Sequence, residues 1–332
     1  MKSTANQPTL THVANAAGVS SATVSRFFNK PDAVAKKTAE RIRQAVLETG
    51  YTPNMVAGSL ASNKSQMVSI LIPQLSPSLF IETIEEIVNK LSASGHVVTV
   101  GVTEFDVDRS NELIKAAIAY RAKAIIITAE ISTVAKKFIR QSNMMAIEIW
   151  DLPADPIDVA VGFSHYDIGK KLAQFIKERG YIRPHFITNA GPRSLKRRKG
   201  FVDEWAQFGE QPSTESRLEL PLKYEYSRSA FALIRRMDEL PDVIVCGSDW
   251  LAQGIITEAK SFGMKIPDDI AVIGFGNSSI SSEMRPTITS IDVDSENIAQ
   301  TVTEILEKTN KSEELTNRSI DTGFKIIARE SA

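Results

Sequence analysis

Apolar side chains recur at helical spacing in three short stretches near the start of the chain. Helix by helix, these positions are Val13, Ala14 and Ala17; Val24 with Phe27 or Phe28; and Ala39, Ile42 and Val46. Such spacing places the apolar side chains on one face of each helix. Gly18 and Gly50 follow the first and third stretches, where glycine takes the left-handed conformation that ends a helix. The pattern predicts three short helices around one small core, and Pro53 prevents the third helix from continuing.

Beyond residue 66 the pattern changes to short β-branched runs that alternate with amphipathic helices. The first series of runs lies at 68–72, 97–100, 124–127 and 145–149, and the second at 159–161, 185–188, 243–246 and 270–275. Apolar runs of this length are typical of buried parallel strands. Two crossover helices are marked by Ile84, Ile87, Val88 and Leu91, and by Leu113, Ala117 and Tyr120. Two successive doubly wound units predict two lobes with a cleft between them.

The first two predicted helices are joined by a tight turn at Gly18. Thr9 and Ser20 stand just before these helices, where a hydroxyl accepts an N–H of the first helical turn. The outer face of the second helix then carries small or polar residues, namely Ser21, Ala22, Thr23, Ser25 and Arg26. A helix, a glycine turn and a second helix with such a face form the helix-turn-helix pattern. We therefore expect a DNA-binding domain at the start of the chain.

These motifs resemble one family of bacterial transcription regulators, the LacI (lactose-repressor) family. The matching stretches are 9–14, 18–26, 51–54 and 57–60, and the chain ends in the family's usual Arg329-Glu330-Ser331. Residues 68–331 resemble the family's sugar-binding core. Within the family, the stretches 76–80, 148–151 and 161–163 look closest to the gluconate and idonate repressors.

The resemblance implies an α/β fold in three parts. An N-terminal three-helix helix-turn-helix headpiece (8–53) precedes a hinge helix and linker (54–65). Two doubly wound parallel-sheet lobes of periplasmic-binding-protein type (66–331) then bind the effector and dimerise. The hinge should be helical only when two copies pack on bent DNA. Gly58 stands where relatives commonly have Arg, and because a helical Gly costs about 1 kcal/mol relative to Ala, this hinge should melt easily.

By the same resemblance, the headpiece and hinge contact palindromic double-stranded operator DNA. Ser21 and Ala22 occupy the outward positions that read bases, and Arg26 lies one turn further along, where it could take guanine O6 and N7. Leu60 falls where the family inserts a leucine into the minor groove. The full expected set is Thr9, Ser20, Ser21, Ala22, Thr23, Ser25, Arg26, Asn29, Asn54, Ala57 and Leu60.

Ligands of doubly wound sheets bind beyond the carboxyl ends of the strands. The loops at these ends supply the expected effector site, which comprises Phe80, Glu130, Asp151, His165, Arg197, Ser248, Asp249, Phe275 and Asn277. By resemblance, Arg197 reaches into the family's effector cleft, where its planar fork would clamp a carboxylate. Asp249 would accept from sugar hydroxyls, with Trp150 or Trp250 among the apolar walls. We expect the basic side chains next to Arg197 in the sequence to lie on a solvent-exposed helix face. These are Lys196, Arg198 and Lys199.

The chain departs from the family pattern at three places in this site. Ser248 stands where the family usually has Asn, Gly276 where it usually has Asp, and Ser164-His165 where many relatives have Asp-Asn. These changes leave His165 and Arg197, which favours an anionic effector of the gluconate kind. A sugar phosphate and a neutral sugar remain alternatives, as does a corepressor that tightens operator binding.

Charge is divided unevenly along the chain. The 332 residues carry a formal net charge of −1, but residues 1–64 hold eight Lys or Arg against three acids, while the remainder holds 31 against 37. A basic N-terminal stretch followed by an acidic remainder is expected of a protein that contacts DNA phosphates through its N-terminal end.

Other function classes lack their motifs in this sequence. There is no Walker-type phosphate loop, no His-Glu-x-x-His, no cysteine pair and no nucleophile elbow, so an enzyme is not expected. The four histidines lack metal-like spacing, and neither a metal nor a cofactor is expected. Cys246 lies in an apolar run, which is typical of a buried, inert thiol.

The start of the chain lacks the layout of a signal peptide, and no apolar run reaches about 18 residues. We therefore expect a cytoplasmic, nucleoid-associated homodimer without membrane contact. No heptad tail follows Ser331 to build a tetramer. A periplasmic sugar receptor with the same core fold is the distant alternative, and the headpiece argues against it.

Overall fold

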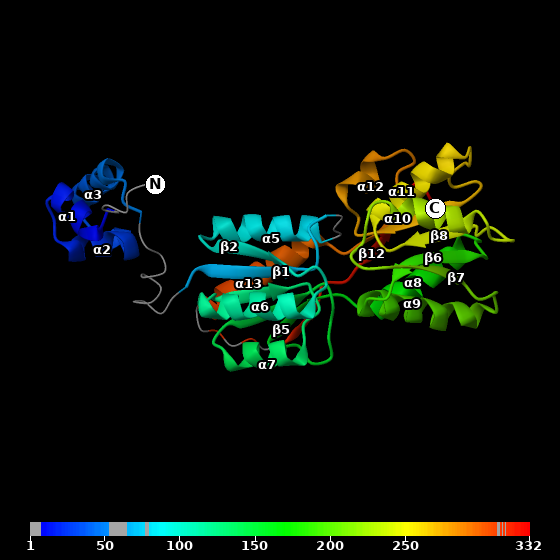
Figure 1. Ribbon diagram of the computed structural model, residues 1–332, viewed down its shortest axis with the longest axis horizontal. Coiled ribbons are helices and arrows are strands. Elements are labelled where there is room, and N and C mark those ends of the chain that lie inside the picture. The colour runs from blue at the N-terminus through cyan, green and yellow to red at the C-terminus, as the bar shows by residue number, and fades with distance from the viewer. Residues whose placement is uncertain (1–7, 53–64, 77–79, 311–312, 314, 316) are drawn as a thin grey trace. The chain divides into compact units, whose positions relative to one another are not determined.

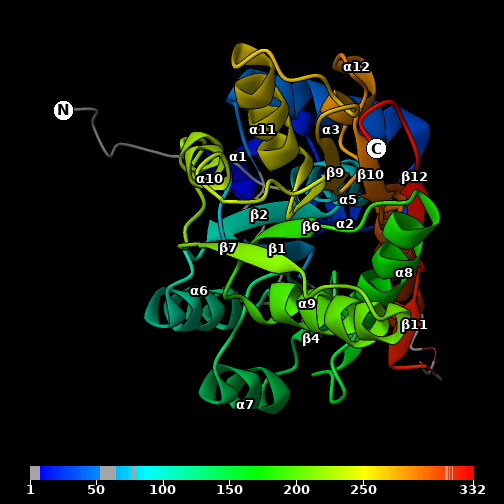
Figure 2. The ribbon, with the colours of Figure 1, turned by 90° about the vertical axis from the view of Figure 1, so that its right-hand side faces the viewer.

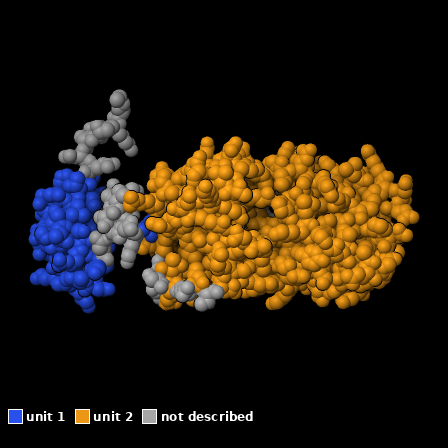
Figure 3. All heavy atoms as spheres, turned by 90° about the horizontal axis from the view of Figure 1, so that it is seen from below, with its two compact units in different colours: residues 1–65 blue, residues 66–332 orange. Residues whose placement is uncertain are grey.

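A computed structural model describes the chain except for residues 1–7, 53–64, 77–79, 311–312, 314 and 316. The chain divides into two compact units, residues 1–65 and 66–332, which Figure 3 colours separately. The expected hinge residues Asn54, Ala57, Gly58 and Leu60 lie outside the described residues.

The first unit consists of short helices around one core (Figure 1). Its elements are α1 (Leu10–Ala17), α2 (Ser21–Asn29), the 3-10 turn η1 (Pro31–Ala33) and α3 (Lys36–Thr49). Buried in the core are Val13, Ala14, Ala17, Val24, Ile42 and Ala45. Phe27 and Phe28 both pack against this core. The predicted three-helix arrangement is confirmed, and both phenylalanines of α2 contribute to it.

The turn between α1 and α2 is tied to α3. Gly18 adopts φ +61°, the left-handed conformation expected for it. Arg41 of α3 donates to the carbonyl of Ala17 and, at 3.2 Å, to that of Gly18. These bonds satisfy carbonyls at the end of α1 that have no helical partner. The angle between α1 and α2 is therefore supported by a side chain from the third helix.

The second unit has two lobes, each built on a six-stranded sheet (Figure 1). The first sheet has the order β11-β5-β4-β3-β1-β2, with β1 (Met67–Ile72), β2 (Val97–Val102), β3 (Ala124–Ile127), β4 (Met145–Ile149), β5 (Val159–Gly162) and β11 (Ser319–Asp321). The second has the order β12-β10-β9-β8-β6-β7, with β6 (Pro184–Asn189), β7 (Thr214–Leu218), β8 (Val243–Cys246), β9 (Ala271–Phe275), β10 (Thr289–Asp292) and β12 (Lys325–Ile327). In the described chain, only the β10–β12 pair is antiparallel. The predicted pair of parallel-sheet lobes is confirmed.

Helices cover both faces of each sheet (Figures 1 and 2). In the first lobe, α5 (Ile81–Ala93) and α13 (Ser295–Asn310) pack together on one face, and α6 (Val107–Ala119) and α7 (Thr133–Gln141) cover the other. In the second lobe, α8 (His165–Glu178) and α9 (Pro192–Trp205), which η2 (Ala206–Phe208) extends, lie opposite α10 (Tyr226–Ile234) and α11 (Asp249–Ser261). The short α12 (Ser279–Glu283) follows β9.

Within the described residues the chain passes between the lobes three times. β5 belongs to the first sheet, where Val159 pairs with Ile147 of β4, and only then does the chain enter α8 of the second lobe. The expectation that residues 159–161 open the second lobe is wrong, because composition does not reveal which sheet a strand joins. The chain later returns from β10 to α13 and finally runs from β11 to β12.

Two local expectations in the first lobe are also wrong. β2 is an edge strand rather than a buried one, and Val97 and Val100 are 53% and 43% exposed. α6 ends at Ala119, so Tyr120 is 68% exposed instead of facing the core, while Ile114 is fully buried. An edge position depends on neighbouring strands, whereas β-branched composition reports only the strand itself.

Two glycines let α8 and α9 pack backbone to backbone. A Cβ added at Gly169 would lie 2.0 Å from the carbonyl oxygen of Arg197, and one added at Gly200 would lie 2.0 Å from that of Tyr166. Both obstacles are main-chain atoms inside helices, which cannot move aside as a flexible side chain does. This contact fixes the main chain of Arg197 relative to α8.

We expect Gly169→Ala to lower the free energy of unfolding of the second unit by about 1–3 kcal/mol, because the added methyl must push the two helices apart. Urea unfolding followed by tryptophan fluorescence measures this, since the chain's three tryptophans all lie in this unit. Gly247→Ala is the matched control, because its methyl would meet the nearest described atom, the Ile187 oxygen, at 3.5 Å. Wild-type stability of Gly169→Ala would contradict the close contact.

Candidate functional site

The outer face of α2 carries the residues expected to read DNA. Ala22 and Arg26 are exposed, and Ser21 and Ser25 are partly exposed. Val24 on the opposite side is fully buried in the core. The helix therefore presents one small, polar face whose first turn is free to enter a groove of double-stranded DNA.

Two expected phosphate-binding hydroxyls lie at helix starts. Ser20 Oγ accepts the N–H of Thr23 at 3.2 Å and lies 2.9 Å from Thr23 Oγ1. Thr9 precedes α1, and its N–H donates to His12 Nδ1 at 3.1 Å. Helix starts favour phosphate because their N–H groups and dipole attract negative charge. Asn29 ends α2, and its side chain lies outside the described set.

A cavity of about 300 Å³ lies between the two lobes of the second unit, beyond the carboxyl ends of strands from both sheets. We call it the interlobe cavity. Five expected effector residues line it, namely Phe80, Glu130, His165, Arg197 and Phe275. Trp150, expected as an apolar wall, lines it as well. The strand-end argument from the sequence thus placed residues from both lobes around one space.

Arg197 is held at the wall of this cavity without a carboxylate partner. Its Nη1 donates to Nδ1 of His165 at 2.9 Å, and its guanidinium carbon lies 4.2 Å from the ring centre of Phe275. Burial, and next the charge of Arg193, lower the pKa of Arg197 to about 10, so it remains charged at neutral pH. Its Nε and Nη2 have no hydrogen-bond partner among the described residues. These donors are available to an anion.

Both ring nitrogens of His165 bond to protein groups, so this side chain orients Arg197 instead of contacting an anion. Because a guanidinium only donates, Nδ1 of His165 must accept, and Nε2 carries the proton that bonds to the carbonyl of Trp150 at 2.9 Å. Burial, and then the charges of Arg197 and Arg193, hold the pKa of His165 well below its usual value. His165 therefore adds no positive charge to the site, because the ring is neutral.

Arg193 is a cavity residue that the sequence reasoning missed. It donates to the carbonyls of Thr128 at 2.8 Å and Ile149 at 3.0 Å, so a side chain of the second lobe bonds the strand ends of the first. Its guanidinium also lies over the ring of Phe80, 5.7 Å from the centre. The available signal was its place four residues before Arg197, which puts both on one face of a helix.

Four expected effector residues lie outside the interlobe cavity, and three of them, Ser248, Asp249 and Asn277, form hydrogen bonds within the second lobe. Asp249 is 2% exposed, and its carboxylate accepts from Ser290 Oγ at 2.6 Å and from both the N–H and Oγ of Ser278 at 2.7 and 2.9 Å. Ser248 caps α11. Asn277 Oδ1 accepts from Arg329 at 2.6 Å. These groups hold the second lobe together, so the picture of Asp249 as an acceptor for sugar hydroxyls needs correction.

The remaining expectations around α9 also change. Asp151 lies beside the cavity rather than in it, and Lys196 donates to its two oxygens at 3.0 and 2.8 Å. Arg198 is not on a solvated face, because it packs over Phe186 and pairs with Glu215 at 3.3 Å. Trp250 contacts Tyr224, away from the cavity lining.

The described residues contain no cluster of His, Cys, Asp and Glu placed to hold a metal ion. Cys246 is buried, and burial raises the pKa of its thiol, which disfavours a nucleophilic thiolate. None of the described helices is long and apolar enough to cross a membrane.

Two family models match the chain. The model for bacterial regulatory proteins of the lacI family matches residues 9–54, and the periplasmic binding protein-like domain matches residues 173–332. The HTH-type transcriptional regulator GntR of Pseudomonas aeruginosa is 32% identical over 332 residues, which are 99% of this chain and 96% of that protein. The regulator of the same name in Escherichia coli K12 is 26% identical over 96% of this chain and 97% of that protein.

Solved structures agree with these matches. A LacI-family transcriptional regulator from Silicibacter pomeroyi superposes with a TM-score of 0.87 at 28% identity, covering 98% of this chain and 99% of that one. The lac repressor dimer bound to operator and the anti-inducer ONPF superposes with a TM-score of 0.84 at 22% identity, over 98% and 99% of the chains. The second similarity concerns the fold alone.

We expect His165→Gln to flatten the pH dependence of stability. Below pH 6.5 the unfolded chain protonates His165 while the folded chain does not, so the free energy of unfolding of wild type falls as the pH drops. Urea unfolding at pH 7, 6 and 5 should show a smaller fall for the variant. His185, whose pKa burial lowers to about 4, acts equally in both proteins. Parallel curves would mean that His165 is not held neutral.

Proposed function

Because the chain belongs to the LacI family of bacterial transcriptional regulators, we propose that its interlobe cavity senses a small sugar acid of the gluconate kind. The chain is a DNA-binding transcriptional regulator and not an enzyme. Its N-terminal unit binds operator DNA, and its periplasmic-binding-protein-like part binds a small effector. The proposal concerns the chemistry of that effector and the way its binding reaches the DNA.

The observation that carries the proposal is the state of Arg197. This guanidinium is partly buried and charged, it is oriented by a neutral histidine and an aromatic face, and two of its nitrogens have no partner among the described residues. A carboxylate would supply the missing acceptors and the missing negative charge, and planar Arg–carboxylate pairs are strong for both reasons.

The rest of the cavity supports a polyol attached to that carboxylate. Phe80, Trp150 and Phe275 provide apolar walls for C–H faces, and Glu130 at the mouth offers acceptors for hydroxyls. The sequence resemblance to gluconate and idonate repressors points the same way. A sugar phosphate is the second candidate, because Arg193 places another guanidinium in the same wall.

On the DNA side, we propose that Ser21, Ala22 and Arg26 of α2 read bases while Thr9, Ser20, Thr23, Ser25 and Asn29 hold phosphates. Asn54, Ala57 and Leu60 are proposed for the hinge. A homodimer through the second unit would match a palindromic operator. Effector binding would then favour one lobe arrangement over another and release the operator by that difference in affinity.

We expect Arg26→Ala to lower the ratio of operator to random-DNA affinity, because a bidentate contact to guanine is worth about 1–3 kcal/mol of discrimination. Both DNAs are titrated at one salt concentration. Arg43→Ala is the matched control, since it removes the same charge from the same unit, on α3 beside Glu40. If Arg26→Ala weakens binding to operator and to random DNA by the same factor, as Arg43→Ala is expected to do, then Arg26 contacts phosphates only.

We expect Arg197→Lys to weaken gluconate binding more than about tenfold, because it keeps the charge but loses the planar pair of donors. Calorimetry with gluconate, gluconate 6-phosphate and glucose measures this. Arg235→Lys is the matched control, because Arg235 also stacks on a phenylalanine, Phe262 at 3.5 Å, away from the cavity. Tight glucose binding, or no effect of Arg197→Lys, would overturn the proposal.

A further inference from the structure

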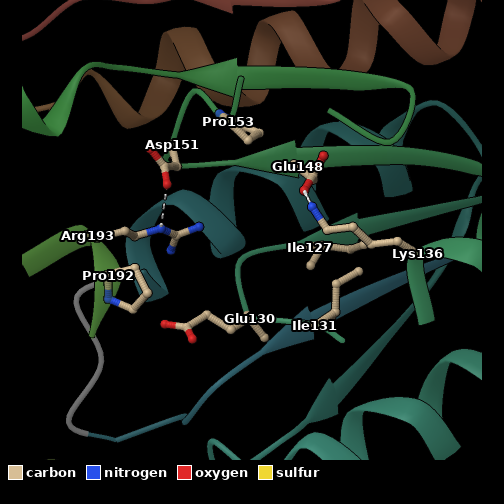
Figure 4. Close-up of a pocket in the computed structure, with 10 residues that line it drawn as sticks. Ile127, Glu130, Ile131, Lys136, Glu148, Asp151, Pro153, Pro192 and Arg193 are labelled. Carbon is tan, nitrogen blue, oxygen red and sulfur yellow. Dashed lines mark hydrogen bonds and ion pairs between the residues drawn. The ribbon is translucent and has the colours of Figure 1, made fainter. Parts of the chain in front are cut away.

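A second, smaller cavity of about 220 Å³ opens beside the interlobe cavity (Figure 4). We call it the side chamber. It lies at the carboxyl ends of β3 and β4, the same sheet edge that borders the interlobe cavity. The two spaces share four lining residues, namely Ala129, Glu130, Pro192 and Arg193. The two spaces therefore adjoin at these residues.

The side chamber combines an apolar surface with polar groups. Ile127, Ile131 and Pro153 supply aliphatic contacts, and Figure 4 shows the two isoleucines between Glu130 and the Lys136–Glu148 pair. Aliphatic walls beside hydroxyl-binding groups suit a sugar ring, which has C–H faces and a polar rim.

The side chamber and the interlobe cavity differ in the charged residues that line them. Three acids, Glu130, Glu148 and Asp151, line the side chamber against two bases, Lys136 and Arg193. Lys136 pairs with Glu148 at 3.4 Å, and Arg193 lies 4.0 Å from Asp151. Glu130 has no hydrogen-bond or ion-pair partner among the described residues. Lys196 also donates to both oxygens of Asp151, so Glu130 is the lining carboxylate left to accept from hydroxyl donors.

The lining of the interlobe cavity has an excess of positive charge. Arg193 and Arg197 line it against Glu130 alone, since His165 is neutral. Its volume of about 300 Å³ lies at the lower end of small-molecule sites, which span roughly 300–1,000 Å³. A ligand extending from one space into the other would meet positive charge at one end and acceptors at the other.

We propose that the side chamber is a second subsite that binds a neutral sugar unit linked to the sugar acid. The effector class then includes glycosyl aldonates, with the carboxylate at Arg197 and the added sugar against Ile131 and Glu130. This inference rests on the proposed sugar-acid function. It assigns a ligand-binding role to side-chamber residues outside the expected effector set, such as Ile131 and Pro153.

Calorimetry of the full chain with gluconate, lactobionate and maltobionate tests the subsite. Wild type should bind at least one of the two glycosyl gluconates as tightly as gluconate. Ile131→Trp fills the side chamber, so it should weaken that glycosyl gluconate more than about tenfold and gluconate less than about twofold. Val134→Trp is the matched control, because Val134 is 55% exposed nearby on α7 and does not line the chamber.

Pro153→Phe repeats the test from the opposite side in case Ile131→Trp does not fold, because Pro153 also lines only the side chamber. Gluconate binding without binding of either glycosyl gluconate overturns the subsite and leaves the proposed function standing. Equal weakening of both ligand classes by the filled chamber also overturns it, because the chamber would then belong to the gluconate site. Failure of all three acids to bind overturns the proposed function instead.

Discussion

The constraint behind this architecture is the partial burial of a guanidinium that bonds to no carboxylate among the described residues. Removing a positive charge from water is costly, and proteins usually compensate for it with a carboxylate. For Arg197 the compensation comes from a histidine lone pair and the face of Phe275. An acidic neighbour would stabilise the free protein but would compete with an incoming anion. The neutral partner keeps the arginine oriented and its charge available.

The two arginines of α9 that line the interlobe cavity, Arg193 and Arg197, have different roles. Arg193 gives its donors to strand-end carbonyls of the first lobe, while Arg197 keeps its donors for the space between the lobes. One turn of α9 therefore connects the proposed ligand contact of Arg197 with the contact that Arg193 makes to the first lobe. The backbone contact at Gly169 and Gly200 holds that helix against α8, which starts where the chain enters the second lobe. Movement of Arg197 is therefore movement of the lobe.

The sequence predicted features that depend on near neighbours and failed where distant partners decide. Gly18 and Val24 were placed correctly, because helix periodicity and the left-handed turn are local properties. Asp249 was misplaced, since it starts α11 while its partner Ser290 lies on β10, and no spacing rule reveals that bond. Arg193 was missed for the same reason, because its acceptors belong to the other lobe. The family resemblance, rather than periodicity, identified Arg197.

The His165–Arg197 pair bears on what kind of signal the protein can report. Burial keeps the imidazole neutral, and the guanidinium, with a pKa of about 10, stays ionised at neutral pH. Neither group gains or loses a proton when an anion arrives near neutral pH, so occupancy follows ligand concentration alone. The affinity of this cavity for an anion should therefore not vary with pH near neutrality.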